Sequence, residues 1–215
     1  DKISGEVILV QNSGVLMGLK NYFGLAPIPV NGVYRFGGIA NLSTLIPTAG
    51  REAISRDSIN QINKLMMMVE WEVSQQISKT EYADNNIQFM QYVVSNNEYD
   101  LASKITIDVK PDETTVELGK VAERCGNRVV HYYAGTDPST IRTFSSEGAC
   151  LLVLSQSNPR KQIQERFIKG LKIKGLPDKP RINKIFNKSE LSIEELAIMV
   201  RIASIMDEFY LLSNV

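Results

Sequence analysis

Histidine and cysteine are scarce in this chain, which excludes several common kinds of site. The 215 residues include one histidine, His131, and two cysteines, Cys125 and Cys150. A structural zinc site takes four cysteine or histidine ligands, so the chain does not provide one. Nucleophilic catalysis is poorly supported, because His131 lies among β-forming residues and no Gly-x-Ser-x-Gly sequence is present. The two cysteines are far apart in sequence and are typical of buried, reduced thiols.

Long apolar runs and an excess of charge of one sign are also missing. No stretch reaches the roughly 18 apolar residues of a membrane-spanning helix, and no signal-peptide pattern opens the chain. Lysine plus arginine and aspartate plus glutamate both number 24, so no overall field favours nucleic acid or membrane. We expect a cytoplasmic protein. Because the chain begins at Asp1 within polar residues, we also expect it to be a piece of a longer protein.

The first forty residues predict short strands. Residues 6–10 form an apolar run typical of a strand, and residues 33–39 are rich in β-branched and aromatic side chains, with a glycine pair that indicates a bulge or a close backbone approach. Residues 19–25 fit either a strand or a helical turn. Pro27 and Pro29 are expected to interrupt whatever precedes them.

A long amphipathic helix is predicted after these strands. From residue 57 to about residue 80, apolar residues recur three or four positions apart, which is the spacing of one helix face. Such a helix is on the order of 35 Å long. Asp57 and Ser58 are the expected N-cap residues. Three methionines at 66–68 and Trp71 widen the apolar face. We expect core packing with one methionine partly exposed, in preference to the alternative of a methionine-rich recognition surface.

From residue 105 the pattern changes to alternating strands and helices. Strands are predicted at 105–109, 128–134 and 149–154, and the last is fully apolar and therefore central. Helices are predicted at 86–94, 115–124, from Pro138 onward and at 158–169. This alternation indicates a small α/β layer with a mostly parallel sheet. Ser192 and Glu195 form a capping box that opens a last helix.

Two stretches of the second half are candidates for binding charged ligands. The turn 135–140 follows a strand and opens a helix, where phosphates often bind. It lacks the phosphate-loop pattern, so a capped turn is favoured, with an independent α/β enzyme at this turn as an alternative. Residues 160–188 form a basic stretch that fits an acidic partner or nucleic acid, although such runs are usually solvated faces. Its basic residues are Arg160, Lys161, Arg166, Lys169, Lys172, Lys174, Lys179, Arg181, Lys184 and Lys188.

Two arginines, Arg51 and Arg56, flank the start of the long helix. That end of the helix dipole disfavours cations. A surface ion pair with Glu52 or Asp57 is one explanation. The other is an arginine presented on a loop to a phosphate bound elsewhere, the arginine-finger arrangement. Composition alone leaves both explanations open.

Several stretches together resemble the middle domain of the heat-shock protein 90 chaperones, the HtpG type in bacteria. Residues 34–41 (YRFGGIAN) and 45–54 (LIPTAGREAI) are similar to the family's L-R-F-v-k-G-V-v-D and d-L-p-L-N-v-S-R-E. Residues 130–135 (VHYYAG) resemble its i-Y-Y-l-t-G strand and turn, and residues 145–154 (SSEGACLLVL) its f-k-k-G-y-e-V-L-l-l strand. The resemblance covers roughly residues 30–155, with departures that indicate a divergent bacterial relative.

The resemblance implies an α/β fold in consecutive parts. Residues 1–82 would form an α/β sandwich like the second domain of ribosomal protein S-five, with the long helix. Residues 83–102 would be a helical connector, and residues 103–185 a small α/β/α unit. Residues 186–215 would be a helix that leads to a following domain.

The resemblance also implies a role in an ATP-dependent chaperone. The arginine of the family's S-R-E contacts the γ-phosphate of ATP in a separate N-terminal domain, and that catalytic role falls on Arg51. Nucleotide-binding residues would be Arg51, Ser55 and Arg56, although the family has glutamine where Ser55 stands. The cofactor would be ATP with Mg²⁺, held mainly outside this chain, so the chain alone is expected to be inactive.

The expected partners follow from the same resemblance. They are the N-terminal ATP-binding domain of the parent, client proteins, and a second copy of the parent in a homodimer. Neither a membrane nor nucleic acid is expected. The alternative function is a non-catalytic interaction module that binds an acidic partner or nucleic acid through the basic stretch.

Overall fold

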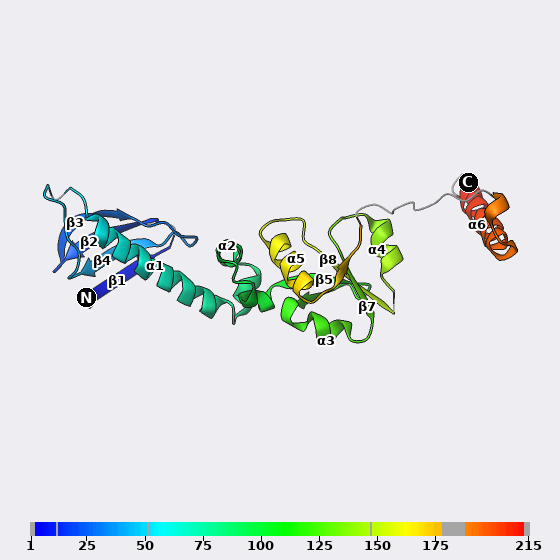
Figure 1. Ribbon diagram of the computed structural model, residues 1–215, viewed down its shortest axis with the longest axis horizontal. Helices are drawn as coiled ribbons and strands as arrows, with labels where there is room; N and C mark the ends of the chain where they lie inside the picture. The colour runs from blue at the N-terminus through cyan, green and yellow to red at the C-terminus, as the bar shows by residue number, and fades with distance from the viewer. Residues whose placement is uncertain (1–2, 12, 51, 147, 178–187, 213–215) are drawn as a thin grey trace. The chain divides into compact units, whose positions relative to one another are not determined.

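The computed structural model describes residues 3–11, 13–50, 52–146, 148–177 and 188–212 (Figure 1). The chain divides into two compact units, Asp1–Asp178 and Lys179–Val215. The first unit is mixed α/β, with one four-stranded and one five-stranded sheet, so the predicted α/β class is confirmed at this level.

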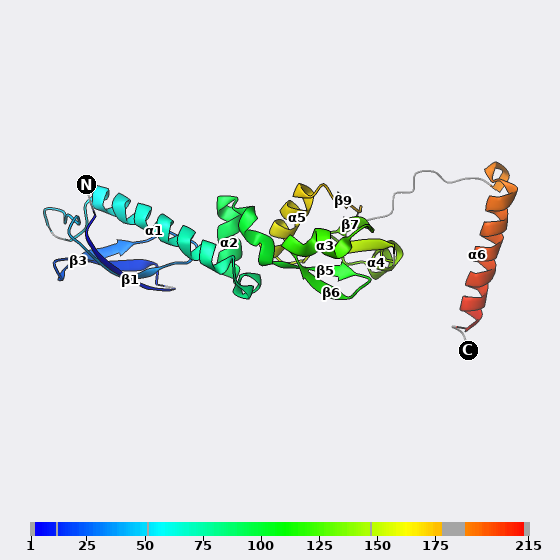
Figure 2. The same ribbon diagram turned by 90° about the horizontal axis from the view of Figure 1, so that it is seen from below.

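The first sheet has the strand order β1-β4-β2-β3. Its strands are β1 (Gly5–Val10), β2 (Val15–Lys20), β3 (Phe23–Pro29) and β4 (Gly37–Leu42). Strands β2 and β4 run parallel, whereas β1 with β4 and β2 with β3 are antiparallel. The long helix α1 (Arg56–Ile77) runs alongside this sheet in both Figure 1 and Figure 2. Ile62 and Met66 of α1 are buried in one core with Leu16 and Ile28 of the sheet.

The segment 19–25, for which the sequence allowed a strand or a helical turn, forms the hairpin between β2 and β3. It is two strand ends joined by Asn21 and Tyr22, which have positive φ angles of 50° and 66°. Pro27 and Pro29 lie inside β3, so the prediction that they interrupt structure is wrong. A strand at the edge of a sheet tolerates proline, because an outward-facing N–H has no partner to lose.

The predicted strand at 33–39 begins later than expected. Arg35 has a φ of 50°, and its N–H donates to the carbonyl oxygen of Gly32, so the chain turns before β4 starts. A close backbone approach at the glycine pair is confirmed. Gly38 has a φ of 122°, and a Cβ there would clash with the carbonyl oxygen of Ile8 on β1.

Short helices connect α1 to the second sheet. They are the 3-10 helix η1 (Glu81–Asp84), α2 (Ile87–Asn96) and the 3-10 helix η2 (Tyr99–Lys104). The side chain of Asn86 caps α2 by accepting from the N–H of Phe89. Asn97 ends α2 in the left-handed conformation, with a φ of 58°, and turns the chain toward Tyr99.

The second sheet has the order β6-β5-β8-β7-β9. Its strands are β5 (Thr106–Lys110), β6 (Thr114–Glu117), β7 (Val129–Tyr133), β8 (Ala149–Val153) and β9 (Lys174–Gly175). β8 is central, as its apolar sequence predicts. β7 pairs in parallel with β8 and β9, whereas β5 is antiparallel to β6 and β8. The sheet is therefore mixed, and the prediction of a mostly parallel sheet is wrong.

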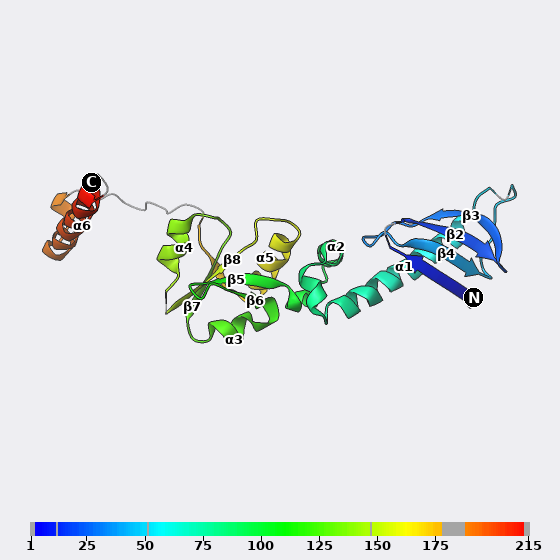
Figure 3. The same cartoon turned by 180° about the vertical axis from the view of Figure 1, so that it is seen from behind.

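The α-helices that accompany this sheet are α3 (Val121–Cys125), α4 (Pro138–Phe144) and α5 (Arg160–Gly170). The predicted helix at 115–124 is wrong in its first part. Residues there form β6, followed by the 3-10 helix η3 (Leu118–Lys120). Ile163 and Ile168 of α5 are buried in one core with Ile107 and Leu152 of the sheet. Figure 3 shows α5 beside β5 and β8.

The second unit contains η4 (Lys188–Glu190) and α6 (Ile193–Leu212). The predicted capping box is confirmed. The N–H of Ser192 donates to Oε2 of Glu195 at 2.8 Å, and the N–H of Glu195 donates to Oγ of Ser192 at 3.2 Å. Of the helices that are described, none combines the length and the apolar character needed to cross a membrane.

Candidate functional site

The segment that contains the predicted catalytic arginine is a closed loop before α1. The N–H of Thr48 donates to the carbonyl oxygen of Ala53 at 2.8 Å, and the N–H of Ser55 donates to that of Ile46 at 2.8 Å. Pro47 and Ile54 form an antiparallel bridge between these bonds. The two sides of the loop are thus fastened to each other. Arg51 lies in sequence between them but outside the described residues, so its predicted role stays a prediction.

The base of the loop is fixed by two serines. Oγ of Ser55 accepts from the N–H of Ser58 at 3.3 Å and donates to its Oγ at 3.0 Å. Ser58 is 2% exposed, and its Oγ also accepts from the N–H of Ile46 at 3.0 Å. The N-cap is therefore Ser55, and the prediction of Asp57 or Ser58 is wrong. Ser58 is unsuitable because its hydroxyl holds the loop to the helix.

The other two predicted nucleotide-binding residues lie at the start of α1. Ser55 is half-buried and Arg56 is exposed. Within the described part of the chain, no carboxylate lies within 4.0 Å of the Arg56 guanidinium. The ion pair of Arg56 with Asp57 is therefore not formed. Arg56 is free to meet an anion beside the loop.

Buried polar contacts hold the middle of α1 to the turn before β4. The N–H of Tyr34 donates to Oε1 of Glu70 at 3.0 Å, and the Tyr34 hydroxyl lies 2.8 Å from Oγ of Ser74. Burial raises the pKa of Glu70, opposed by the N–H groups of Tyr34 and Val33. Burial also raises the pKa of Tyr34, to about 12. These contacts fix the middle of α1 to the turn before β4.

A second polar network lies just beyond the other end of α1. Nη1 of Arg160 on α5 lies 2.6 Å from Oδ1 of Asp84, and the guanidinium also reaches the Asp84 carbonyl oxygen. Asp84 accepts the N–H of Thr106 at 2.8 Å. Burial acts to raise the pKa of Asp84, but the donors of Arg160 and Thr106 outweigh it and lower that pKa. Arg160 is therefore a structural residue.

The outer face of α1 carries an apolar patch, formed by Met67, Met68 and Trp71. Met67 and Met68 are each 69% exposed and Trp71 is 47% exposed. With Glu72 they line a hollow of about 370 Å³. Only Met66 of the methionine run is buried, so the prediction of core packing with a single partly exposed methionine is wrong. This face of α1 exposes three large apolar side chains to solvent.

The turn at 135–140 is a capped helix start, as favoured from the sequence. The carboxylate of Asp137 accepts the backbone N–H groups of Ser139 and Thr140 and both of their hydroxyls. The bonds from Thr140 and Ser139 lower the pKa of Asp137 to about 2. The N–H and hydroxyl groups that could donate to a phosphate are therefore already hydrogen-bonded to the Asp137 carboxylate.

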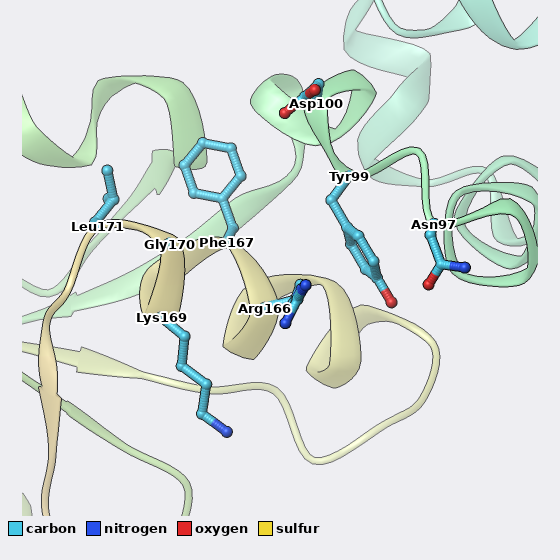
Figure 4. Close-up of a pocket in the computed structure, with 8 residues that line it drawn as sticks. All are labelled: Asn97, Tyr99, Asp100, Arg166, Phe167, Lys169, Gly170 and Leu171. Carbon is cyan, nitrogen blue, oxygen red and sulfur yellow. The ribbon is translucent and has the colours of Figure 1, made fainter.

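The basic stretch has fewer free cations than its sequence indicates. Arg160 binds Asp84, and Nζ of Lys169 lies 2.7 Å from Oε1 of Glu165. Residues 179–187 lie outside the described residues. Arg166 is exposed, with its Cζ 5.9 Å from the centre of the Tyr99 ring. Arg166 and Tyr99 border a cavity of about 570 Å³ between η2 and α5 (Figure 4).

The cysteines are buried, as predicted. Cys125 is 3% exposed, Cys150 is fully buried, and their Sγ atoms lie 2.7 Å apart as free thiols. Burial, with the bond to Cys150, raises the pKa of Cys125 to about 12. His131 lies half-buried within β7. In the described ranges, no three histidine, cysteine, aspartate or glutamate side chains are grouped so as to hold a metal ion.

Sequence reasoning missed the cavity beside Arg166. Arg166 is named within the basic stretch, but Tyr99 carries no motif and is distant from it in sequence. Only tertiary structure brings the two together. Comparisons with known proteins found neither a matching family model nor a matching curated protein.

Proposed function

We propose that this chain is the middle segment of an ATP-dependent chaperone of the heat-shock protein 90 type. In this proposal Arg51 contacts the γ-phosphate of ATP that is bound, with Mg²⁺, mainly by a separate N-terminal domain of the parent protein. The sequence resemblance around residues 34–54 supports the assignment. The carrying observation is the closed loop, fastened by the Thr48–Ala53 and Ser55–Ile46 hydrogen bonds and followed directly by the capped helix α1.

A loop of this kind suits the delivery of a side chain to a ligand held elsewhere. Because both sides of the loop are fastened, the loop loses less conformational entropy when it contacts the nucleotide. Phosphoryl transfer depends mainly on positioning and on charge stabilisation at the transferred group. A supplied guanidinium provides both, and the exposed Arg56 adds positive charge nearby.

The proposal assigns client binding to the apolar patch of Met67, Met68 and Trp71. Methionine is flexible and adapts to differently shaped apolar partners, and exposed apolar patches mark interaction sites. Both methionines are largely exposed. An unfolded client segment would bury its apolar side chains in the hollow beside Trp71.

The test is Arg51→Ala in the full-length parent, with Arg142→Ala as the matched control. Arg142 is exposed on α4, distant in sequence from the loop. Supplied arginines contribute about 10³-fold or more to turnover, so we expect ATPase activity to fall by that order. The control retains full activity. Turnover within about twofold of the unchanged parent would refute the role of Arg51.

A second measurement uses the chain alone. By calorimetry it should bind no ATP, and it should hydrolyse none, because the proposed nucleotide site lies mainly outside it. ATP binding by the isolated chain would instead favour an independent enzyme.

A further inference from the structure

The cavity beside α5 is built from two segments that are distant in sequence. The connector contributes Asn97, Tyr99 and Asp100, and the end of α5 with the residue after it contributes Arg166, Phe167, Lys169, Gly170 and Leu171. Figure 4 shows the Tyr99 ring extending from the connector toward the part of α5 that carries Arg166. The volume of about 570 Å³ lies within the range of small-ligand sites.

Among the described residues, the charge balance of this cavity leaves one free cation. Nζ of Lys169 is bound to Glu165 at 2.7 Å, and in Figure 4 its side chain extends away from the other labelled residues. No carboxylate within the described ranges lies within 4.0 Å of the Arg166 guanidinium. The Tyr99 ring lies on one side of that guanidinium, 5.9 Å from Cζ to the ring centre, within cation–π distance. Arg166 is therefore positioned to receive a single anionic group.

The rest of the lining favours a peptide over a phosphate compound. Phe167 and Leu171 provide apolar surface, and Leu171 is 42% exposed. Asp100 and the carbonyl end of α5 are negative, so they disfavour a ligand with several negative charges, such as a polyphosphate. A peptide with an acidic side chain next to an apolar one offers a carboxylate, an apolar group and backbone N–H groups together.

We propose that this cavity binds an acidic peptide segment of a partner protein. The carboxylate of its Asp or Glu pairs with Arg166, which can bind both oxygens at once. The neighbouring apolar side chain lies on Phe167 and Leu171. A backbone N–H group of the peptide faces Asp100. The site is separate from the loop of Arg51, so it does not depend on the proposed ATPase role.

Gly170 offers a way to close the cavity without disturbing the fold. A Cβ added at Gly170 meets no atom within 4 Å, and the residue does not have a positive φ. Gly170→Leu therefore adds a side chain at the cavity wall while leaving the charge of Arg166 unchanged. Glycine is also a weak helix former, so the substitution does not weaken α5.

The experiment titrates two matched peptides into the ¹⁵N-labelled chain. The probes are N-acetylated, C-amidated Gly-Glu-Leu-Gly and its neutral counterpart Gly-Gln-Leu-Gly. We expect the acidic peptide to shift the amide signals of Asn97, Gly170 and Leu171 and to bind about fivefold more tightly, as one exposed charge pair contributes. Arg166→Gln should remove this preference, and Gly170→Leu should lower the affinity of the chain for both peptides.

Controls keep the test independent of folding. Arg166→Lys retains the charge but not the paired geometry, so part of the preference should remain. Arg142→Gln, an equivalent charge loss on exposed α4, should leave the preference intact. The proposal is overturned by equal affinities for the two peptides, by shifts confined to other residues, or by no binding at about 10 mM peptide, well above a millimolar Kd. Tighter, Arg166-dependent binding of oligo-dT would also overturn it and assign the cavity to nucleic acid.

Discussion

The buried hydroxyl pair between Tyr34 and Ser74 gives a sharp test of how α1 is held. Tyr34 is 1% exposed, Ser74 is fully buried, and their oxygens lie 2.8 Å apart. Tyr34→Phe removes one oxygen and leaves the Ser74 hydroxyl buried without that partner. Ser74→Ala likewise leaves the Tyr34 hydroxyl buried without its partner. The double variant removes both oxygens and keeps the packing.

The expected free energies of unfolding depend on this geometry. A buried polar group without a partner destabilises a protein by about 1–3 kcal/mol, whereas replacing both partners by apolar groups is nearly neutral. We expect each single variant to lose about 1.5 kcal/mol. The double variant should lose clearly less than the sum of the two, with a coupling of about 1 kcal/mol or more between residues in contact.

Urea unfolding followed by tryptophan fluorescence measures these changes. Trp71 is the chain's one tryptophan and lies on α1, one turn before Ser74, so its emission reports on this helix. Equal denaturant slopes among the four proteins establish that only stability has changed. Strictly additive losses would refute the reasoning, because they would mean that the two hydroxyls do not depend on each other.

Two further predictions concern the Asp84–Arg160 pair and the apolar patch. The low pKa of Asp84 means that its pair with Arg160 stabilises the fold fully above about pH 4, the unfolded value, and progressively less as pH falls through the folded pKa. The stability difference between the chain and Asp84→Asn, by urea titration, should therefore shrink below about pH 4; a constant difference contradicts this. For the apolar patch, Met67→Gln with Met68→Gln should weaken the parent's binding of a labelled unfolded protein about fivefold, by fluorescence anisotropy, with ATPase turnover unchanged; unchanged affinity contradicts the client assignment.

The elements that were predicted correctly are those whose structure depends mainly on residues close in sequence. The apolar run at 149–154 gives the central strand β8, because only a strand covered on both faces is apolar throughout. The helical spacing after residue 57 gives α1 to within a few residues. The reciprocal capping of Ser192 and Glu195 is local and was also predictable.

Tertiary pairing determined the parts that sequence patterns missed. Residues 114–117 share a helical spacing with residues 118–124, but pairing with β5 makes them the edge strand β6. Ser58 looks like an N-cap by type, yet its hydroxyl is taken by Ile46, so the cap moves to Ser55. Pro27 is compatible with a strand only because β3 lies at an edge.

The two candidate sites differ in the same way. Arg51 was proposed because motif resemblance concerns a contiguous stretch of chain, and its role stays a prediction. The cavity of Tyr99 and Arg166 depends on where the connector and α5 meet, and no periodicity relates residues that far apart. Exposure of Met67 and Met68 was missed because a run of three methionines has no period from which to read its buried side.

The fastening of α1 near both ends has a mechanical consequence. Ser58 ties its first turn to the loop, and Asp84, shortly after its last residue, is held by Arg160. Its 22 helical residues form a stiff rod of about 33 Å. A tilt of about 5° at the loop end displaces the far end by about 3 Å over that length. The contacts at Ser58, Tyr34 and Asp84 therefore all act against such a tilt, because each lies at a different point along the rod.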